Sequence, residues 1–265
     1  MYGAIVGDIV GSRFEFNNYR KKDFELFTPE CFATDDSIMT IAVADALLKC
    51  HYDYSKLSEQ TARSLREIGQ PYPDCGYGGK FAQWMYGVID GPYNSFGNGS
   101  AMRVSACGWI ANSIGQAKEL SRKVTEVTHN HPEGIKGAEA IATSIHILGR
   151  KGKSKKFIRK WITENYYPLD FTIDEIRPTY KFDETCQNTV PQAIECFLEA
   201  NSFEDAIRTA VSLGGDSDTI AAITGSLAEA EWGVPKAFRE KADTYLNNQL
   251  RNIVKTFRIE TLFND

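Results

Sequence analysis

The run 214–220, with the sequence GGDSDTI, constrains the fold more than any other stretch, because it leads directly into the apolar segment 221–230. Two adjacent glycines permit backbone angles that side chains forbid, so the aspartates behind them can lie on an irregular turn at the start of a helix. The residues that follow show apolar helical spacing interleaved with small residues, which allows neighbouring helices to approach closely. Asp216, Asp218 and Thr219 supply more oxygen atoms than a helix cap requires. We therefore expect this acidic helix start to point into the protein or into a cleft.

A second acidic helix start occurs nearer the N-terminus, where Thr34, Asp35 and Asp36 precede the segment 38–48. This segment would be apolar almost all round as a helix, which is typical of a buried helix. Two like charges about 4 Å apart repel by roughly 4 kcal/mol at an effective dielectric near 20, and a helix dipole alone does not offset that repulsion. The Thr, Asp, Asp set of this start mirrors the Asp, Asp, Thr set of the first.

Gly3, Gly7 and Gly11 recur every four residues in the apolar N-terminal segment. This spacing predicts a tightly packed helix or a buried strand with a glycine-rich turn, and periodicity alone does not decide between them. Glu15 follows between two phenylalanines, just before a polar and aromatic loop over 17–32. Glu15 is either a solvated loop residue or a carboxyl group whose pKa is raised by an apolar setting, which would suit acid/base chemistry.

Helical patterns dominate the rest of the chain, and no β alternation is sustained. A glycine-rich loop over 91–100 precedes a helix that begins near Ala101; such a loop either binds phosphate or is a flexible surface loop. We predict one all-α domain spanning residues 1–265. Its further helices are expected at 55–69, 81–86, 117–128, 135–148, 157–166, 187–199, 203–213 and 235–257, with an irregular segment at 168–185.

Composition narrows the class of protein. The formal charge of −5 and the pI near 5.5 argue against general nucleic-acid binding and against binding to acidic membranes. No signal peptide is visible, and no uncharged run reaches the roughly 18 residues of a membrane span, so a soluble, cytoplasmic protein is expected. The six cysteines form no C-x-x-C pair, and the chain has only four histidines, so the sequence argues against a zinc site. A monomer is expected by default.

Convergence of the two acidic helix starts would require cations. The set comprises four carboxylates and two hydroxyls, and oxygen ligands without histidine or cysteine favour Mg²⁺ or Mn²⁺ over zinc. Two such ions can bind the vicinal hydroxyls of a sugar and deliver a water to its anomeric carbon. Together with a phosphate-binding loop, this predicts a ligand that is both a diol and a phosphate ester, as a ribose diphosphate is.

The motifs of the chain resemble, in order, those of the ADP-ribosylglycohydrolases, relatives of dinitrogenase reductase-activating glycohydrolase. The resemblance extends from residue 3 to about residue 230, and five motifs in the right order are more specific than any one. They are GDIVGSRFE from Gly7, TDDS from Thr34, GNGSAMR from Gly97, HNHP from His129 and GGDSDT from Gly214. The resemblance implies an all-α orthogonal helical bundle that hydrolyses the bond between C1″ of ADP-ribose and an acceptor.

The same resemblance assigns residues to a dinuclear Mg²⁺ or Mn²⁺ centre and to a substrate cleft. Glu15 corresponds to the mobile acidic residue near the distal ribose, and His131 is expected to line the cleft. Tyr93 and Phe96 are candidates for stacking on adenine, although no motif fixes that residue. The implied metal ligands are Thr34, Asp35, Asp36, Asp216, Asp218 and Thr219, and the implied diphosphate-binding residues are Asn98, Gly99 and Ser100.

The mechanistic hypothesis is that two ions hold the 2″- and 3″-hydroxyls while an activated water attacks C1″. Asp36, Asp216 or Glu15 would receive the proton of the water, and the sequence does not choose among them. A non-catalytic ADP-ribose-binding protein of the same fold is one alternative. A prenyl diphosphate synthase is another, but that class needs a D-D-x-x-D motif, and the third position after Asp36 is Met39. The acceptor, such as a protein arginine or serine, O-acetyl-ADP-ribose or a nucleobase, is not readable from the motifs.

Overall fold

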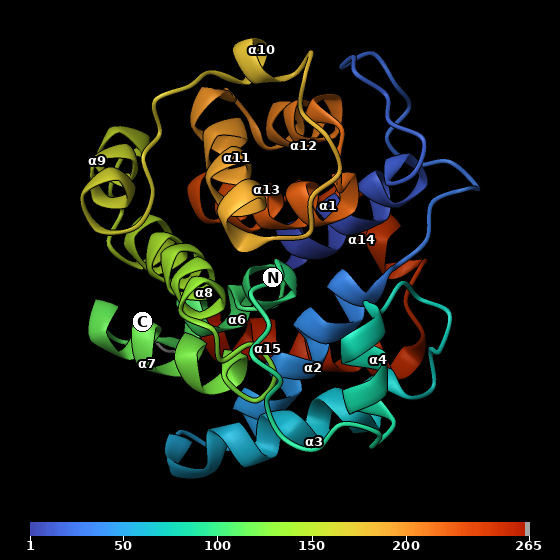
Figure 1. The fold of residues 1–265 in the computed structure, drawn as a ribbon, viewed down its shortest axis with the longest axis vertical. Helices are drawn as coiled ribbons and strands as arrows, with labels where there is room; N and C mark the ends of the chain where they lie inside the picture. Colours follow the sequence, from blue (N-terminus) through green and yellow to red (C-terminus); the bar gives the residue numbers. More distant parts are fainter. Residues whose placement is uncertain (263–265) are drawn as a thin grey trace.

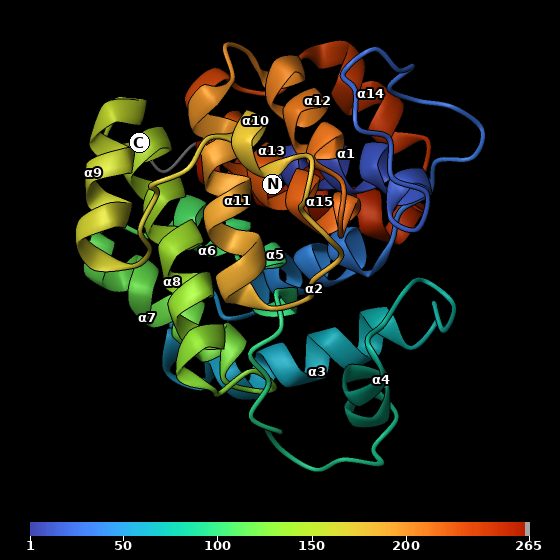
Figure 2. The same ribbon diagram turned by 45° about the horizontal axis from the view of Figure 1, so that its top comes forward.

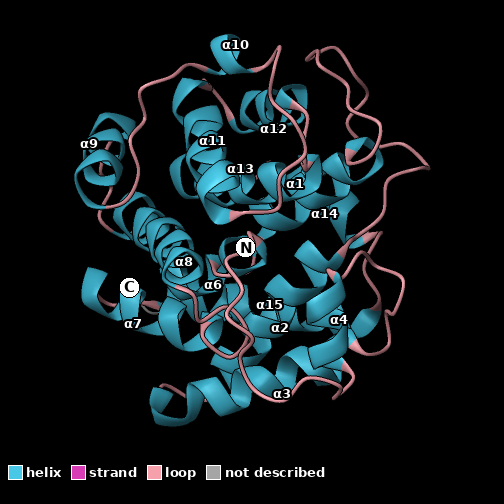
Figure 3. Cartoon of the chain, viewed as in Figure 1, coloured by secondary structure: helices cyan, strands magenta, loops and turns pink. Residues whose placement is uncertain are grey.

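The computed structural model describes residues 1–262, and these fold into helices joined by loops, with no strand among them (Figures 1 and 3). The prediction of an all-α fold is confirmed. Among the described residues, no helix combines the length and the apolar character needed to cross a membrane.

The N-terminal glycine pattern forms a helix, α1 (Tyr2–Gly11), that packs along α13 (Ser217–Trp232) (Figures 1 and 2). A β-carbon on Gly7 would lie 2.0 Å from the carbonyl oxygen of Ala221, and one on Gly3 would lie 2.0 Å from that of Gly225. Side chains at these positions would force the two backbones apart. The close packing places the C-terminal end of α1 beside the acidic start of α13.

A buried carboxylate on α1 holds the other acidic helix start, that of α2 (Asp35–Lys49). Asp8 is fully buried and accepts hydrogen bonds from the backbone nitrogens of Thr34 at 3.0 Å and Ser37 at 3.1 Å. The hydroxyl of Thr34 also donates to Asp8 at 2.6 Å. Asp8 therefore fixes the first turn of α2 relative to α1.

The remaining helices surround this centre. Figure 1 shows α11 and α12 on α13 in the upper half of the view, and α3 and α15 beside α2 in the lower half. The helices are α3 (Leu57–Gly69), α4 (Gly79–Met85), α5 (Gly99–Met102), α6 (Ser105–Ile110), α7 (Ile114–Thr125), α8 (Pro132–Ile145), α9 (Lys155–Asn165), α10 (Ile173–Ile176), α11 (Cys186–Glu199), α12 (Phe203–Leu213), α14 (Lys236–Asp243) and α15 (Asn248–Leu262).

Two predicted segments differ in the structure. The helix expected over 235–257 is two helices, α14 and α15, because the chain turns at 244–247, where Leu246 is buried and the side chain of Asn247 accepts the backbone N–H of Leu250. The segment 168–185, expected to be irregular, contains the short helix α10. A reciprocal capping box between Thr172 and Glu175 stabilises that turn.

Candidate active site

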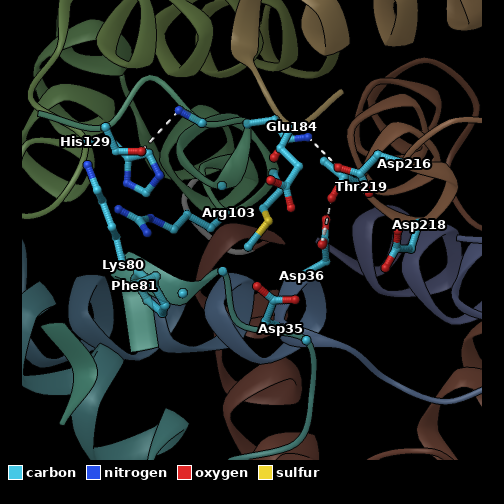
Figure 4. Close-up of a pocket in the computed structure, with 18 of the residues that line it drawn as sticks. Asp35, Asp36, Lys80, Phe81, Arg103, His129, Glu184, Asp216, Asp218 and Thr219 are labelled. Atoms are coloured by element: carbon cyan, nitrogen blue, oxygen red, sulfur yellow. Dashed lines mark hydrogen bonds between the residues drawn. The ribbon is translucent and has the colours of Figure 1, made fainter. Parts of the chain in front are cut away.

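A cavity of about 330 Å³ lies where the starts of α2, α5 and α13 meet the segment after α7. Its lining has two chemically different sides, which Figure 4 shows facing one another. Carboxylates from the starts of α2 and α13 form the acidic side, and Lys80, Arg103 and His129 form the basic side. Glycines from two loops also line the cavity.

The acidic side unites residues that are nearly two hundred positions apart in the chain. Glu15, Asp216 and Asp218 offer carboxylate oxygens that all lie within 4.8 Å of one another, a group that could hold a metal ion. Asp35 and Asp36, from the first turn of α2, line the same cavity. The hydroxyl of Thr219 donates to Asp36 Oδ2 at 3.0 Å and so links the two helix starts directly.

The two glycines before α13 are required by the shape of the turn. Gly214 and Gly215 have φ angles of +78° and +74°, a region that favours glycine. The side chain of Asn18 accepts the N–H of Gly215 at 2.8 Å and donates to its carbonyl oxygen at 3.0 Å. Asp216 directly precedes α13, and its side chain makes no capping bond but lines the cavity.

Thr34 caps α2 and lies outside the lining of the cavity. Its oxygen accepts the N–H of Asp36 at 3.2 Å, while its hydrogen goes to Asp8. A hydroxyl oxygen has two lone pairs, so one remains for a further partner. This arrangement is compatible with the predicted role of Thr34 as a metal ligand.

The carboxylates of the acidic side have too few cations and hydrogen-bond donors around them to balance their negative charge. Burial raises the pKa values of Asp35, Asp36 and Asp218 well above their ordinary value, and the neighbouring carboxylates raise them further. Burial, followed by Asp216, Asp8 and Glu184, raises the pKa of Glu15 to about 7. Asp36 Oδ1 and Asp218 Oδ1 are buried with no hydrogen-bond partner in the described part of the chain. A site of buried, unpartnered carboxylate oxygens fits a divalent cation.

The glycine-rich loop contributes residues to the lining of the cavity. An isolated bridge between Gly97 and Thr185 ties this loop to the start of α11. Asn98 and Gly99 line the cavity, and the Asn98 amide donates to Asp216 Oδ2 at 2.6 Å, so Asn98 contacts the acidic side directly. Ser100 lies outside the lining, because its hydroxyl packs against the carbonyl oxygen of Gly97 and the thiol of Cys186.

The histidine that lines the cavity is His129, and His131 lies outside the lining. His131 caps α8, where its Nδ1 accepts the N–H of Glu133 at 3.1 Å, and its ring packs against Phe96. Tyr93 lines the cavity beside His129, with the two ring centres 6.0 Å apart. Of the two aromatic candidates, only Tyr93 is placed at the cavity.

Other functional residues were not singled out by the sequence. Asp8 positions α2, and its sequence signals were its place in the GDIVGSRFE motif and an ionisable side chain inside an apolar helical pattern. Arg103 is buried at the basic side, and its signal was its place in the GNGSAMR motif. Glu184 lines the cavity from the loop before α11 and carried no sequence signal.

The fold and the site define a class of protein: an all-helical protein with an acidic cavity between two helix starts. Comparison with known proteins gives the family. The family model of the ADP-ribosylglycohydrolases matches residues 1–262. The chain therefore belongs to the ADP-ribosylglycohydrolase family.

Named relatives agree with this membership. The chain is 24% identical to ADP-ribosylhydrolase ARH3 of Homo sapiens, with 92% of this chain and 88% of the relative covered. It is 25% identical to the ADP-ribosyl-[dinitrogen reductase] glycohydrolase of Rhodospirillum rubrum, with 83% and 77% covered, and 25% identical to the ADP-ribosylarginine hydrolase Tri1 of Pseudomonas putida, with 88% and 70% covered. A solved structure, the ADP-ribosylglycohydrolase-related protein complex, superposes with a TM-score of 0.64 at 22% identity, with 92% of both chains covered.

Proposed function

We propose that this protein is a metal-dependent hydrolase that cleaves the C1″ glycosidic bond between ADP-ribose and a modified acceptor. The observation that carries the proposal is the acidic side of the cavity, where Asp36 and Asp218 each have a buried oxygen without a hydrogen-bond partner among residues 1–262. Family membership and the names of the relatives support ADP-ribose as the part of the substrate that is recognised.

The proposed cofactor is a pair of Mg²⁺ or Mn²⁺ ions. The chemistry of the donors supports this choice, since all are oxygens of carboxylates or hydroxyls, as hard cations prefer. Bound ions would neutralise the carboxylates and supply Lewis-acid chemistry toward oxygen atoms of the substrate and of water. The residues proposed to hold them are Thr34, Asp35, Asp36, Asp216, Asp218 and Thr219.

The protein's own groups would bind, orient and move protons. With the ions bound, any carboxylate charge that they leave unbalanced would favour the positive charge that develops at C1″ in an oxocarbenium-like transition state. In the metal-free protein, burial raises the pKa of the Glu15 carboxyl to about 7, and Glu15 is one candidate to take or give the proton. Asp36 and Asp216 are the alternative bases, and Asp36 Oδ1 has no competing hydrogen bond within the described chain.

The basic side and the glycine loop are proposed to receive the diphosphate. Asn98 and Gly99 line the cavity there, and His129 stands beside them. Ser100 and His131, which the resemblance also assigns to substrate binding, would act indirectly, by shaping the loop and the start of α8. The proposed monomeric state and cytoplasmic location follow from the sequence expectations alone.

The decisive experiment is incubation with Mg²⁺ or Mn²⁺ and an ADP-ribosylated peptide, with release of free ADP-ribose as the readout. Asp35→Ala, Asp216→Ala and Asp218→Ala should each lower the rate by at least about 100-fold, because each removes a carboxylate at the site of charge development. Asp170→Ala is the matched control, since Asp170 is an exposed aspartate outside the cavity. Full activity in all three cavity variants would overturn the proposal, and tight binding without release would identify a non-catalytic reader.

The acceptor is addressed by a panel of substrates. The name of the Pseudomonas putida relative specifies ADP-ribosylarginine, and the name of the Rhodospirillum rubrum relative specifies an ADP-ribosylated dinitrogen reductase. Arginine-linked, serine-linked and O-acetyl-linked ADP-ribose are therefore compared at equal concentration. A linkage whose kcat/KM exceeds the others by more than about tenfold, or roughly 1.4 kcal/mol of transition-state binding, is the preferred substrate.

A further inference from the structure

His129 is held at the basic side of the cavity by the two segments that flank it. Its backbone N–H donates to the carbonyl oxygen of Thr125 at the end of α7, at 2.9 Å, and the N–H of Tyr93 donates to the carbonyl oxygen of Thr128 at 3.2 Å. A β-carbon on Gly99 would lie 3.3 Å from His129 Nε2. The Nε2 edge of the ring therefore faces the glycine-rich loop.

The other ring nitrogen ends a chain of buried hydrogen bonds. Arg103 Nη2 lies 2.7 Å from Thr128 Oγ1, and Thr128 Oγ1 lies 2.7 Å from His129 Nδ1. The guanidinium of Arg103 can only donate, so the Thr128 oxygen accepts from it. Thr128 is fully buried, and Oγ1 has no further partner in the described part of the chain.

The single hydroxyl hydrogen of Thr128 therefore has one acceptor within reach, His129 Nδ1. If Nδ1 carried a hydrogen instead, the hydroxyl hydrogen would be buried without a partner, which proteins avoid. Burial, and secondarily the charge of Arg103, lower the pKa of His129 well below its ordinary value, so the ring is neutral. A neutral ring that accepts at Nδ1 carries its hydrogen on Nε2.

We propose that Arg103 and Thr128 are positioning residues that hold His129 as the Nε2–H tautomer, so that it donates a hydrogen bond to a substrate oxygen at the glycine-rich loop. This inference rests on the proposed function, because the diphosphate of ADP-ribose is the oxygen-rich group that the loop would receive. The opposite tautomer would present a lone pair to the same oxygen and repel it.

The first test is the tautomer itself, measured on the full-length protein with Mg²⁺ and without substrate. Long-range ¹H–¹⁵N NMR spectra distinguish the two neutral tautomers and the imidazolium by their ring nitrogen shifts. The signal of His129 is assigned among the four histidines by its loss in His129→Gln. The expected result near pH 7 is a pure Nε2–H ring, and an Nδ1–H ring or an imidazolium would overturn the proposal.

The second test compares Thr128→Val with Thr128→Ser. Valine keeps the shape of threonine but removes the hydroxyl, whereas serine keeps the hydroxyl. We expect Thr128→Val to mix the two tautomers of His129 and to weaken ADP-ribose binding, measured by calorimetry, about tenfold. Thr128→Ser should retain the wild-type tautomer and an affinity within about twofold of the wild type.

The outcomes separate this inference from the proposed function. Retention of both the tautomer and the affinity in Thr128→Val would overturn the role of Thr128. If wild-type protein does not bind ADP-ribose at all, the proposed function fails, while the NMR measurement still decides whether the tautomer is fixed. If Thr128→Val does not fold, the spectrum of the wild-type protein remains a complete test of the tautomer.

Discussion

His129 and His131 are only two positions apart, but their side chains have different roles. The ring of His129 lines the cavity, whereas Nδ1 of His131 accepts a backbone N–H at the start of α8. The resemblance to the family placed His131 at the cleft, whereas the structure places His129 in the lining of the cavity. The helix ends at Thr125 instead of at the predicted residue 128, and His129, four residues later, lines the cavity.

Substitution of each histidine by glutamine should separate these roles. His129→Gln is expected to weaken ADP-ribose binding about tenfold, since a hydrogen bond to a charged oxygen contributes roughly 1.5 kcal/mol or more. His131→Gln should leave the affinity within about twofold and lower the free energy of unfolding by about 1 kcal/mol through loss of the helix cap. Calorimetry and urea unfolding measure the two effects. An equal loss of affinity in both variants would contradict this division.

At the scale of helices, the close approach of α1 and α13 positions the site. Gly7→Ala would place a methyl group 2.0 Å from the carbonyl oxygen of Ala221, so the helices must separate. We expect a loss of at least about 3 kcal/mol in the free energy of unfolding, at the upper end for overpacked sites. Gly115→Ala is the control, because the nearest atom to its new β-carbon is 3.8 Å away. Comparable unfolding curves for the two variants would contradict this prediction, because they would show that α1 and α13 accommodate the extra methyl group at little cost.

Asn18 couples the loop of Glu15 to the start of α13. Its amide nitrogen donates to the carbonyl oxygens of Phe14 at 2.8 Å and Gly215 at 3.0 Å, although the residue is exposed. Asn18→Ala should lower kcat about tenfold by loosening Glu15 relative to Asp216, with little change in thermal stability. Asn17→Ala is the matched control, since within the described part of the chain Asn17 is hydrogen-bonded through its backbone and not through its side chain. A fall in stability that accounts for the lost activity would argue against a specific coupling.

The helical elements were predictable from the sequence because their apolar spacing is strong. The spacing of Gly3, Gly7 and Gly11 indicated a closely packed helix but did not identify the helix it packs against, because the contact with α13 depends on the tertiary fold. The final helix was wrongly predicted as continuous, because the amphipathic pattern survives the turn at 244–247. The carboxylates of the acidic side were recognisable in the sequence as two motifs. The bond from Asn98 to Asp216 depends on side-chain direction and was not predictable.

At the scale of the whole molecule, the cavity concentrates opposite charge on its two sides. Five carboxylates from distant segments line the acidic side, namely Glu15, Asp35, Asp36, Asp216 and Asp218, and Glu184 adds a sixth. Arg103 and Lys80 face them from the other side. This distribution suits a substrate whose diol lies at a cation site and whose diphosphate lies near positive charge. It also makes folding of the metal-free protein sensitive to pH.

The sign of that sensitivity follows from the raised pKa values. Burial raises the pKa of Glu15 to about 7 and that of Asp8 to about 6, above their ordinary values of 4.5 and 3.8. Between about pH 4.5 and pH 7, the folded state holds protons that the unfolded chain has released, so the metal-free protein loses stability as the pH rises. Burial lowers the pKa values of His129 and His146, so these two residues make the protein more stable as the pH rises, both with and without metal.

The difference in melting temperature between protein with Mn²⁺ and protein with chelator isolates the carboxylates from these histidines. Protons compete with the cation at low pH, so the difference should be larger at pH 7.5 than at pH 5.5. At a cation concentration of about 100 Kd, we expect the melting temperature with Mn²⁺ to exceed that with chelator by roughly 5 to 10 °C at pH 7.5. At pH 5.5 we expect less than half of that difference. Asp218→Asn should raise the melting temperature of the chelated protein at pH 7.5 and reduce the effect of Mn²⁺, because it removes one repelling charge and one ligand. A metal effect of equal size at both pH values would mean that the ions do not bind at these buried carboxylates.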